Sequence, residues 1–213
     1  MNWFRRLLGG FGKRVFRWKA KKISLFAYNS MIRSVLKKYG ELNENNYEQG
    51  TLDFSSQLEV TGKNIIIEMI NKPILFGLSL DTVLSEDITD LPFIVSLALY
   101  FAFGKAYKKI WTPPFLVPEE NGVLTWVLTQ KKCLACAGET KLTQKDLGKT
   151  SMCNIIAYVW IGMLRALEDY LNFGYDITVK TTKCFMKDDD YGEFQYTFIP
   201  RPKSNNETED PFI

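Results

Sequence analysis

The sequence predicts a single α+β domain in which helices pack on one side of a mostly antiparallel four-stranded sheet. Several long segments carry apolar residues at spacings of three and four, as a helix with one buried face requires. Shorter segments alternate apolar and polar residues, as strands do, and glycine, proline or acidic turns separate them. A chain of 213 residues that is 46% hydrophobic is long enough for one good core. We therefore expect one domain.

The clearest pattern lies in residues 151–198, where a long helix precedes two strands. Ser151 suits the N-cap, and Gly174 can adopt the left-handed conformation that ends a helix. Strands are expected at 177–181 and 194–198, on either side of an acidic turn. The apolar stripe of the helix consists of Ile156, Val159, Trp160, Met163, Leu167, Tyr170 and Leu171. This segment predicts a helix packed on a hairpin.

Two helices are expected before this unit. The first covers residues 24–39 and stops at Gly40, and a polar loop follows at 41–50. The second runs from Phe54 to Met69 and ends before Pro73. In both helices the apolar residues fall on one face. The simplest interpretation of each of these residues is a place in the chain's own core.

The middle of the chain supplies a core helix and a second hairpin. Residues 93–105 are apolar on nearly all sides and follow Pro92, which suits a first helical turn. Residues 111–117 contain two prolines and predict an edge strand or an extended arm. A turn at 119–122 leads to a returning strand at 123–129. The segment 74–85 has no clear period and is expected to be a turn or short helix.

The first 23 residues form a basic, amphipathic segment. Residues 1–40 hold 11 of the 27 Lys and Arg residues and none of the 24 Asp and Glu residues. Such a segment fits anionic lipid, a partner groove or nucleic acid, and its aromatic residues favour lipid, whereas the acidic remainder of the chain would repel a nucleic acid. The expected membrane-binding residues are Trp3, Phe4, Arg5, Arg6, Phe11, Lys13, Arg14, Arg17 and Trp18. The tail at 201–213 is polar and is expected to be disordered.

Residues 152–199 resemble a known superfamily. The segments "GMLRALE" at 162–168, "TTKC" at 181–184 and "EFQYTF" at 193–198 occur in the order and spacing of the C-terminal half of Bet-type TRAPP subunits and 4-vinyl-reductase-type domains. TRAPP is a vesicle-tethering complex, and the vinyl-reductase-type domains bind small molecules. The resemblance extends loosely over residues 24–199. It implies the same α+β fold.

The resemblance also implies sites. In the TRAPP branch the first two helices form the usual subunit contact, which would place Ile32, Leu36, Leu58, Gly62 and Ile66 at a dimer interface. That branch has a buried acyl-chain tunnel and a cysteine near the start of the core helix that carries palmitate. No cysteine lies between Pro73 and Lys105, so covalent acylation there is not expected. A noncovalent apolar ligand would be lined by Phe93, Leu97, Tyr100, Ile156, Trp160 and Met163, and the simpler interpretation of these residues is a solid core.

The residues present exclude several chemistries. The chain has no histidine, which removes Ser-His-Asp and Cys-His catalysis, and it has no phosphate-binding glycine loop. Cys133, Cys136, Cys153 and Cys184 fit a four-thiolate zinc site by type, and the simpler interpretation is buried, packed thiols. The zinc motif of the vinyl-reductase branch would fall on Thr181, Cys184 and Gly192, so two of its three ligands are missing. No metal or cofactor is therefore expected.

The sequence leads to one functional hypothesis and one alternative. We expect a cytoplasmic, non-enzymatic, membrane-peripheral scaffold that forms homodimers or pairs with related TRAPP-like subunits. It would consist of the segment 1–23, the domain 24–200 and the tail 201–213. The longest uncharged apolar run, residues 91–104, is too short to span a bilayer. The alternative is a sensor of the vinyl-reductase type that binds a small molecule and signals to a partner.

Overall fold

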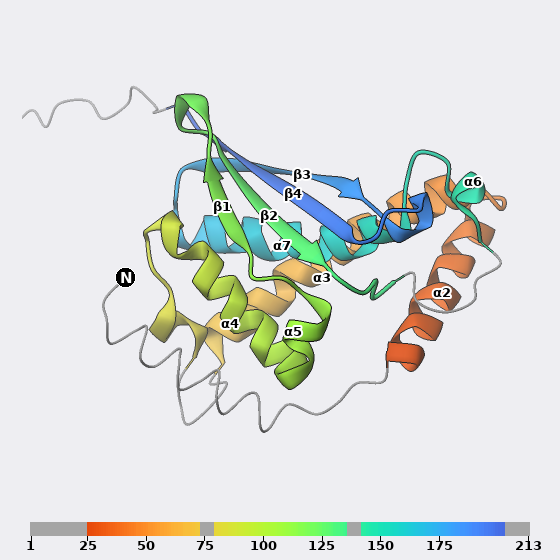
Figure 1. The fold of residues 1–213 in the computed structure, drawn as a ribbon, viewed down its shortest axis with the longest axis horizontal. Helices are drawn as coiled ribbons and strands as arrows, with labels where there is room; N and C mark the ends of the chain where they lie inside the picture. The colour runs from red at the N-terminus through yellow and green to blue at the C-terminus, as the bar shows by residue number, and fades with distance from the viewer. Residues whose placement is uncertain (1–24, 73–78, 136–141, 203–213) are drawn as a thin grey trace, which may run out of the picture.

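The computed structural model describes residues 25–72, 79–135 and 142–202. Within them, helices lie on one side of a four-stranded sheet, as the sequence predicts (Figure 1). The helices are α2 (Leu25–Leu42), α3 (Tyr47–Asn71), α4 (Leu91–Phe103), α5 (Tyr107–Ile110), α6 (Gln144–Leu147) and α7 (Met152–Leu171). The strands are β1 (Phe115–Pro118), β2 (Leu124–Gln130), β3 (Tyr175–Lys183) and β4 (Gly192–Pro200).

The sheet has the order β1-β2-β4-β3, and each neighbouring pair is antiparallel. Both expected hairpins are present, and the two join through β2 and β4, which are far apart in sequence. Trp126 lies opposite Tyr196 and Leu128 opposite Phe194 in the register. All four side chains are buried, because alternate residues of a strand point to the same face. This face is the core side of the sheet, and α7 packs against it.

Several expected helix limits are wrong by a few residues. α2 passes Gly40 and ends at Leu42, and α3 begins at Tyr47 inside the expected loop. Asn46 caps α3, because its side chain accepts a hydrogen bond from the Gln49 N–H at 3.0 Å. α7 ends at Asn172, which adopts the left-handed conformation expected of Gly174. Gly174 also has a positive φ of 82°, but it lies in the connection to β3.

Close contact between helices depends on glycine. Gly62 of α3 and Gly162 of α7 face each other's helices so closely that a Cβ on Gly62 would collide with the backbone oxygen of Val159, and one on Gly162 with that of Glu59. Gly50 of α3 similarly leaves room for the backbone at Tyr39 and Gly40, at 2.8 Å from an added Cβ. α3 is therefore held against both α2 and α7 by positions that only glycine can occupy.

We predict that Gly62→Ala lowers the free energy of unfolding by about 2 kcal/mol, because the added methyl must push α3 away from α7. The matched control is Ser56→Ala, an exposed position on the same helix, which should change stability by less than about 0.5 kcal/mol. Urea denaturation measures the free energy of unfolding of both variants. An isolated helix would gain stability from Gly→Ala, so a stabilised Gly62→Ala variant would contradict the close contact.

Candidate functional site

The interior beneath the sheet is a layer of aromatic side chains. Trp160 of α7 lies between Trp111 and Trp126, with ring centroids 6.4 and 6.2 Å away. Trp126 also packs on Tyr196 at 4.9 Å, and Trp111 approaches Phe194 at 6.4 Å. We call these five rings the aromatic layer. Because they come from α7, from the segment before β1 and from two strands, the layer joins the helices to the sheet.

The six expected pocket residues lie on the two helices that the sequence indicated. Leu97, Ile156, Trp160 and Met163 are buried, whereas Phe93 and Tyr100 are half-buried. Tyr100 packs on Tyr107 with a centroid distance of 4.4 Å. Among the six, Trp160 is itself part of the aromatic layer. The residues thus lie in the core as expected, and their role as a ligand lining stays a prediction.

Tyr196 places a hydroxyl inside this layer. Its side chain is fully buried, and burial raises the pKa of its phenol well above the ordinary value of 10.0. The hydroxyl donates a long hydrogen bond of 3.3 Å to the Ala157 carbonyl oxygen of α7. Because ionisation would place a charge in an apolar interior, Tyr196 stays neutral in the folded protein.

This pKa shift predicts a loss of stability at alkaline pH. The folded pKa of Tyr196 is raised, so its contribution is complete below the unfolded pKa near 10 and is lost as pH rises towards the folded pKa. Tyr196→Phe should therefore reduce the alkaline loss and cost about 1 kcal/mol or less at neutral pH. Denaturation curves from neutral to strongly alkaline pH test this, and an unchanged alkaline slope in the variant would contradict it.

The expected dimer residues face the chain's own core. Ile32, Leu36 and Ile66 are buried, Leu58 packs on the core as a partly buried residue, and Gly62 contacts α7. The sequence pattern found the apolar stripes, but the chain itself covers them. A partner of α2 and α3 would have to contact their other faces. Large apolar side chains are exposed on these two helices: Met31, Leu42, Leu52, Val60, Ile65 and Ile67.

On α3, three of these side chains share one side of the helix. Leu52, Val60 and Ile67 follow each other at spacings of eight and seven residues, so at about 3.6 residues per turn they lie within about a quarter turn of one another. We call Leu52, Val60 and Ile67 the outer stripe. Val60 is 54% exposed although it is an aliphatic residue. Exposed apolar side chains that share one side of a helix are a candidate protein contact, and here the polar residues Ser56 and Lys63 alternate with them on that side.

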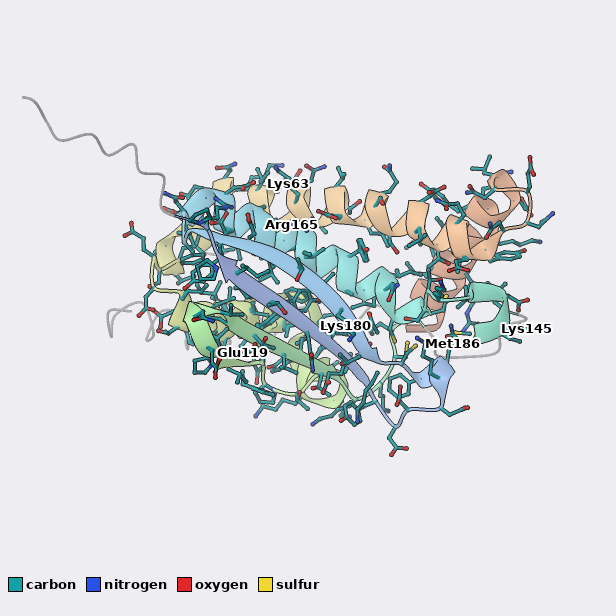
Figure 2. All side chains as sticks on the ribbon, turned by 90° about the horizontal axis from the view of Figure 1, so that it is seen from above. Lys63, Glu119, Lys145, Arg165, Lys180 and Met186 are labelled. Carbon is teal, nitrogen blue, oxygen red and sulfur yellow. The ribbon has the colours of Figure 1, made fainter. Side chains whose placement is uncertain are left out.

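A charged hollow of about 510 Å³ lies between α3, α7 and the start of β3. Arg165 pairs with Glu59 and also donates to the Ile177 carbonyl oxygen at 2.9 Å, while Lys63 pairs with Asp169 at 3.4 Å. Figure 2 labels Lys63 and Arg165 on the adjacent helices α3 and α7. Sequence patterns do not reveal this hollow, because its ion pairs join residues 106 positions apart.

Buried Glu168 organises the end of the same hollow. One of its carboxylate oxygens accepts hydrogen bonds from the N–H groups of Gly174 and Tyr175, at 3.0 and 3.1 Å. The other accepts a hydrogen bond from the guanidinium of Arg201. Arg201 also donates to the Tyr175 carbonyl oxygen. Since β3 is an edge strand, Arg165 and Arg201 occupy carbonyl groups that could otherwise pair with another chain.

The remaining sequence candidates give no assembled site. Cys133, Cys153 and Cys184 are buried, and Cys136 lies outside the described residues. No group of three or more Cys, Asp or Glu within residues 25–72, 79–135 and 142–202 is placed to hold a metal ion. The membrane-binding residues at 3–18 also lie outside the described part. No helix in that part is long and apolar enough to cross a bilayer.

Comparisons with known proteins agree with this architecture at the level of fold. No protein-family model and no curated protein matches the chain. Among solved structures, the chain is similar to trafficking protein particle complex subunit 3 from Naegleria fowleri, covalently bound to palmitic acid. The TM-score is 0.51 at 16% identity, and the likeness covers 84% of this chain and 95% of the other. The chain therefore has the α+β fold of a TRAPP subunit.

Proposed function

We propose that this protein is a non-enzymatic, TRAPP-like scaffold subunit that pairs with a second copy of itself through the outer faces of α2 and α3. The observation that carries the proposal is the outer stripe of Leu52, Val60 and Ile67, on a fold similar to that of a TRAPP subunit. Pairing would remove these side chains from water, which is favourable by about 25 cal/mol per Å² of apolar surface. A related subunit with a similar stripe is the alternative partner.

The charges around the outer stripe suit a contact between two copies. Lys63 lies on α3 near the stripe, and Glu68 and Lys72 form an exposed pair at the end of the same helix. α2 carries a similar mixed set, in which Lys37 and Lys38 lie near Glu41. Since both signs are present on both helices, a two-fold pairing can set unlike charges opposite each other.

A single substitution tests the pairing surface. Val60→Asp should weaken self-association at least tenfold, because it buries a carboxylate in the contact, and it should leave the monomer folded since Val60 is already exposed. The matched control is Phe115→Asp on β1, which is 51% exposed but lies on the sheet side of the molecule. Sedimentation equilibrium measures the dimer dissociation constant of each variant. Equal dissociation constants for wild type and Val60→Asp would remove the outer stripe from the interface.

The second part of the proposal is a cytoplasmic, membrane-peripheral location given by residues 1–23. Its support is the sequence alone, which places Arg and Lys among Trp and Phe side chains there. Each basic residue near an anionic surface contributes about 1 kcal/mol of attraction, and the aromatic rings suit the headgroup boundary. A scaffold held in this way would bring its paired domains to a vesicle surface.

Vesicle sedimentation of the full chain tests the membrane contact. Wild type should sediment with vesicles rich in phosphatidylserine, and raising the salt concentration should release it. Arg5→Glu, Arg6→Glu, Arg14→Glu and Arg17→Glu together should abolish binding, because they reverse four charges of the segment. Equal binding to neutral vesicles, or no binding by wild type, would contradict an anionic-lipid contact and favour the alternative of a ligand sensor.

A further inference from the structure

The outer edge of β3 is closed by side chains. β3 pairs with β4 on one side only, and alternate residues of such a strand point their N–H and C=O groups away from the neighbour. The Tyr175 N–H donates to buried Glu168 at 3.1 Å, and the Tyr175 carbonyl oxygen accepts from Arg201 at 3.1 Å. The Ile177 carbonyl oxygen accepts from Arg165 at 2.9 Å. These side chains take the hydrogen bonds that a further strand would make.

The two arginines that cover this edge are themselves accessible. The side chains of Arg165 and Arg201 are 44% and 43% exposed. Arg165 pairs with Glu59, and Arg201 pairs with Glu168 and Asp176. We call Arg165 and Arg201 the covering arginines. Because ion pairs of exposed side chains contribute little to stability, the covering arginines can leave the edge without loss of the core.

The charged hollow lies beside the same edge. Residues 175–178 of β3 form one wall of this 510 Å³ space, and Glu59, Val60 and Lys63 of α3 form another. Figure 2 shows β3, with Lys180, as the strand nearest α3. A further strand of the sheet would lie next to β3 at the usual spacing of about 4.8 Å. It would therefore enter the charged hollow.

The exposed side chains of β3 fit a second β3. Asp176, Thr178 and Lys180 are exposed on the outer face of the sheet. When two copies of β3 run antiparallel with Thr178 opposite Thr178, Asp176 of each copy lies opposite Lys180 of the other. In this register Ile177 lies opposite Val179, and their main-chain groups face each other. Unlike charges directly opposite each other stabilise a strand pair, whereas a shift of four residues in either direction sets like charges opposite.

We propose that the edge of β3 is a covered docking site for the β3 strand of a second copy. The covering arginines keep the edge closed, and their withdrawal lets two sheets join through residues 175–181. The pairing ends there because the strand has a bulge between Thr181 and Lys183. Since main-chain groups of β3 make this contact, the proposal does not rest on pairing through the outer stripe.

Removal of the covering arginines tests the proposal. Leu52→Asp provides a background without the outer-stripe contact, and Leu52 does not border the charged hollow. In the full chain with Leu52→Asp, Arg165→Ala and Arg201→Ala together should tighten self-association at least tenfold, because the freed carbonyl groups can pair with a second copy. Sedimentation equilibrium measures the dissociation constants. Equal constants with and without the covering arginines would overturn the proposal.

The matched control removes another ion pair of the charged hollow. Lys63 pairs with Asp169 of α7 at 3.4 Å, and this pair covers no main-chain group of β3. Lys63→Ala in the Leu52→Asp background should therefore leave self-association unchanged. A gain equal to that of the two arginine substitutions would show that loss of any ion pair is sufficient, and it would overturn the role of the β3 edge.

An exchange of charges tests the register. In the chain without the covering arginines, Lys180→Asp sets two carboxylates opposite each other and should weaken self-association about tenfold. Adding Asp176→Lys restores unlike pairs with the signs exchanged, and it should return the dissociation constant to within about threefold. General aggregation of a destabilised chain would not show this rescue. Its absence would overturn the pairing of β3 with β3.

A milder variant keeps the test decisive if the chain without both covering arginines does not fold. Arg165→Ala alone uncovers the Ile177 carbonyl oxygen and leaves the Arg201 pair with Glu168 intact. In the Leu52→Asp background it should tighten self-association at least threefold, and no gain would overturn the proposal. If Leu52→Asp associates as wild type does, the outer stripe is wrong, while the comparison with and without the covering arginines still tests the β3 edge.

Discussion

The contact between α3 and α7 is the constraint on which the rest of the fold depends. The two helices approach through Gly62 and Gly162, each of which leaves room for a backbone carbonyl group of the other helix. This approach fixes the position of α7 beneath the sheet, because another side of α7 packs on Trp126 and Tyr196. It also determines which side of α3 is buried. The outer stripe is exposed because α7 already occupies a different side of α3.

The same constraint separates the two proposed activities in space. Contacts with another subunit would use the outward sides of α2 and α3. The apolar ligand expected from the sequence would lie on the inward side of the sheet. The charged hollow around Arg165 and Glu168 lies where α3, α7 and β3 meet, and its ion pairs tie the edge strand to the helices. Subunit pairing and ligand binding can therefore be altered by separate substitutions.

Much of the fold could be predicted from the sequence, because its signals are local. The alternation around Phe194, Tyr196 and Phe198 predicts β4, and all three side chains face the core. The sequence predicts the helix ends less accurately, since Gly40 and Gly174 both suggest the end of a helix. Gly40 instead remains inside α2, where α3 passes close to it, and Asn172 closes α7 before Gly174 is reached. A glycine required for close packing has the same sequence signal as a glycine required for a turn.

The sites were harder to predict, because they depend on tertiary contacts. An apolar stripe in α3 cannot reveal whether α7 or a second subunit covers it. The burial of Gln130 is visible only when β2, β4 and α7 are placed together.

Sedimentation velocity of the unmodified chain, over a wide range of concentrations, tests the central claim of subunit pairing most directly. Pairing predicts a reversible shift from a 24.6 kDa monomer to a species of twice that mass as concentration rises. The shift should persist at high salt, because the outer stripe is apolar and salt screens only the charges around it. A chain that remains monomeric at every concentration would contradict pairing with a second copy.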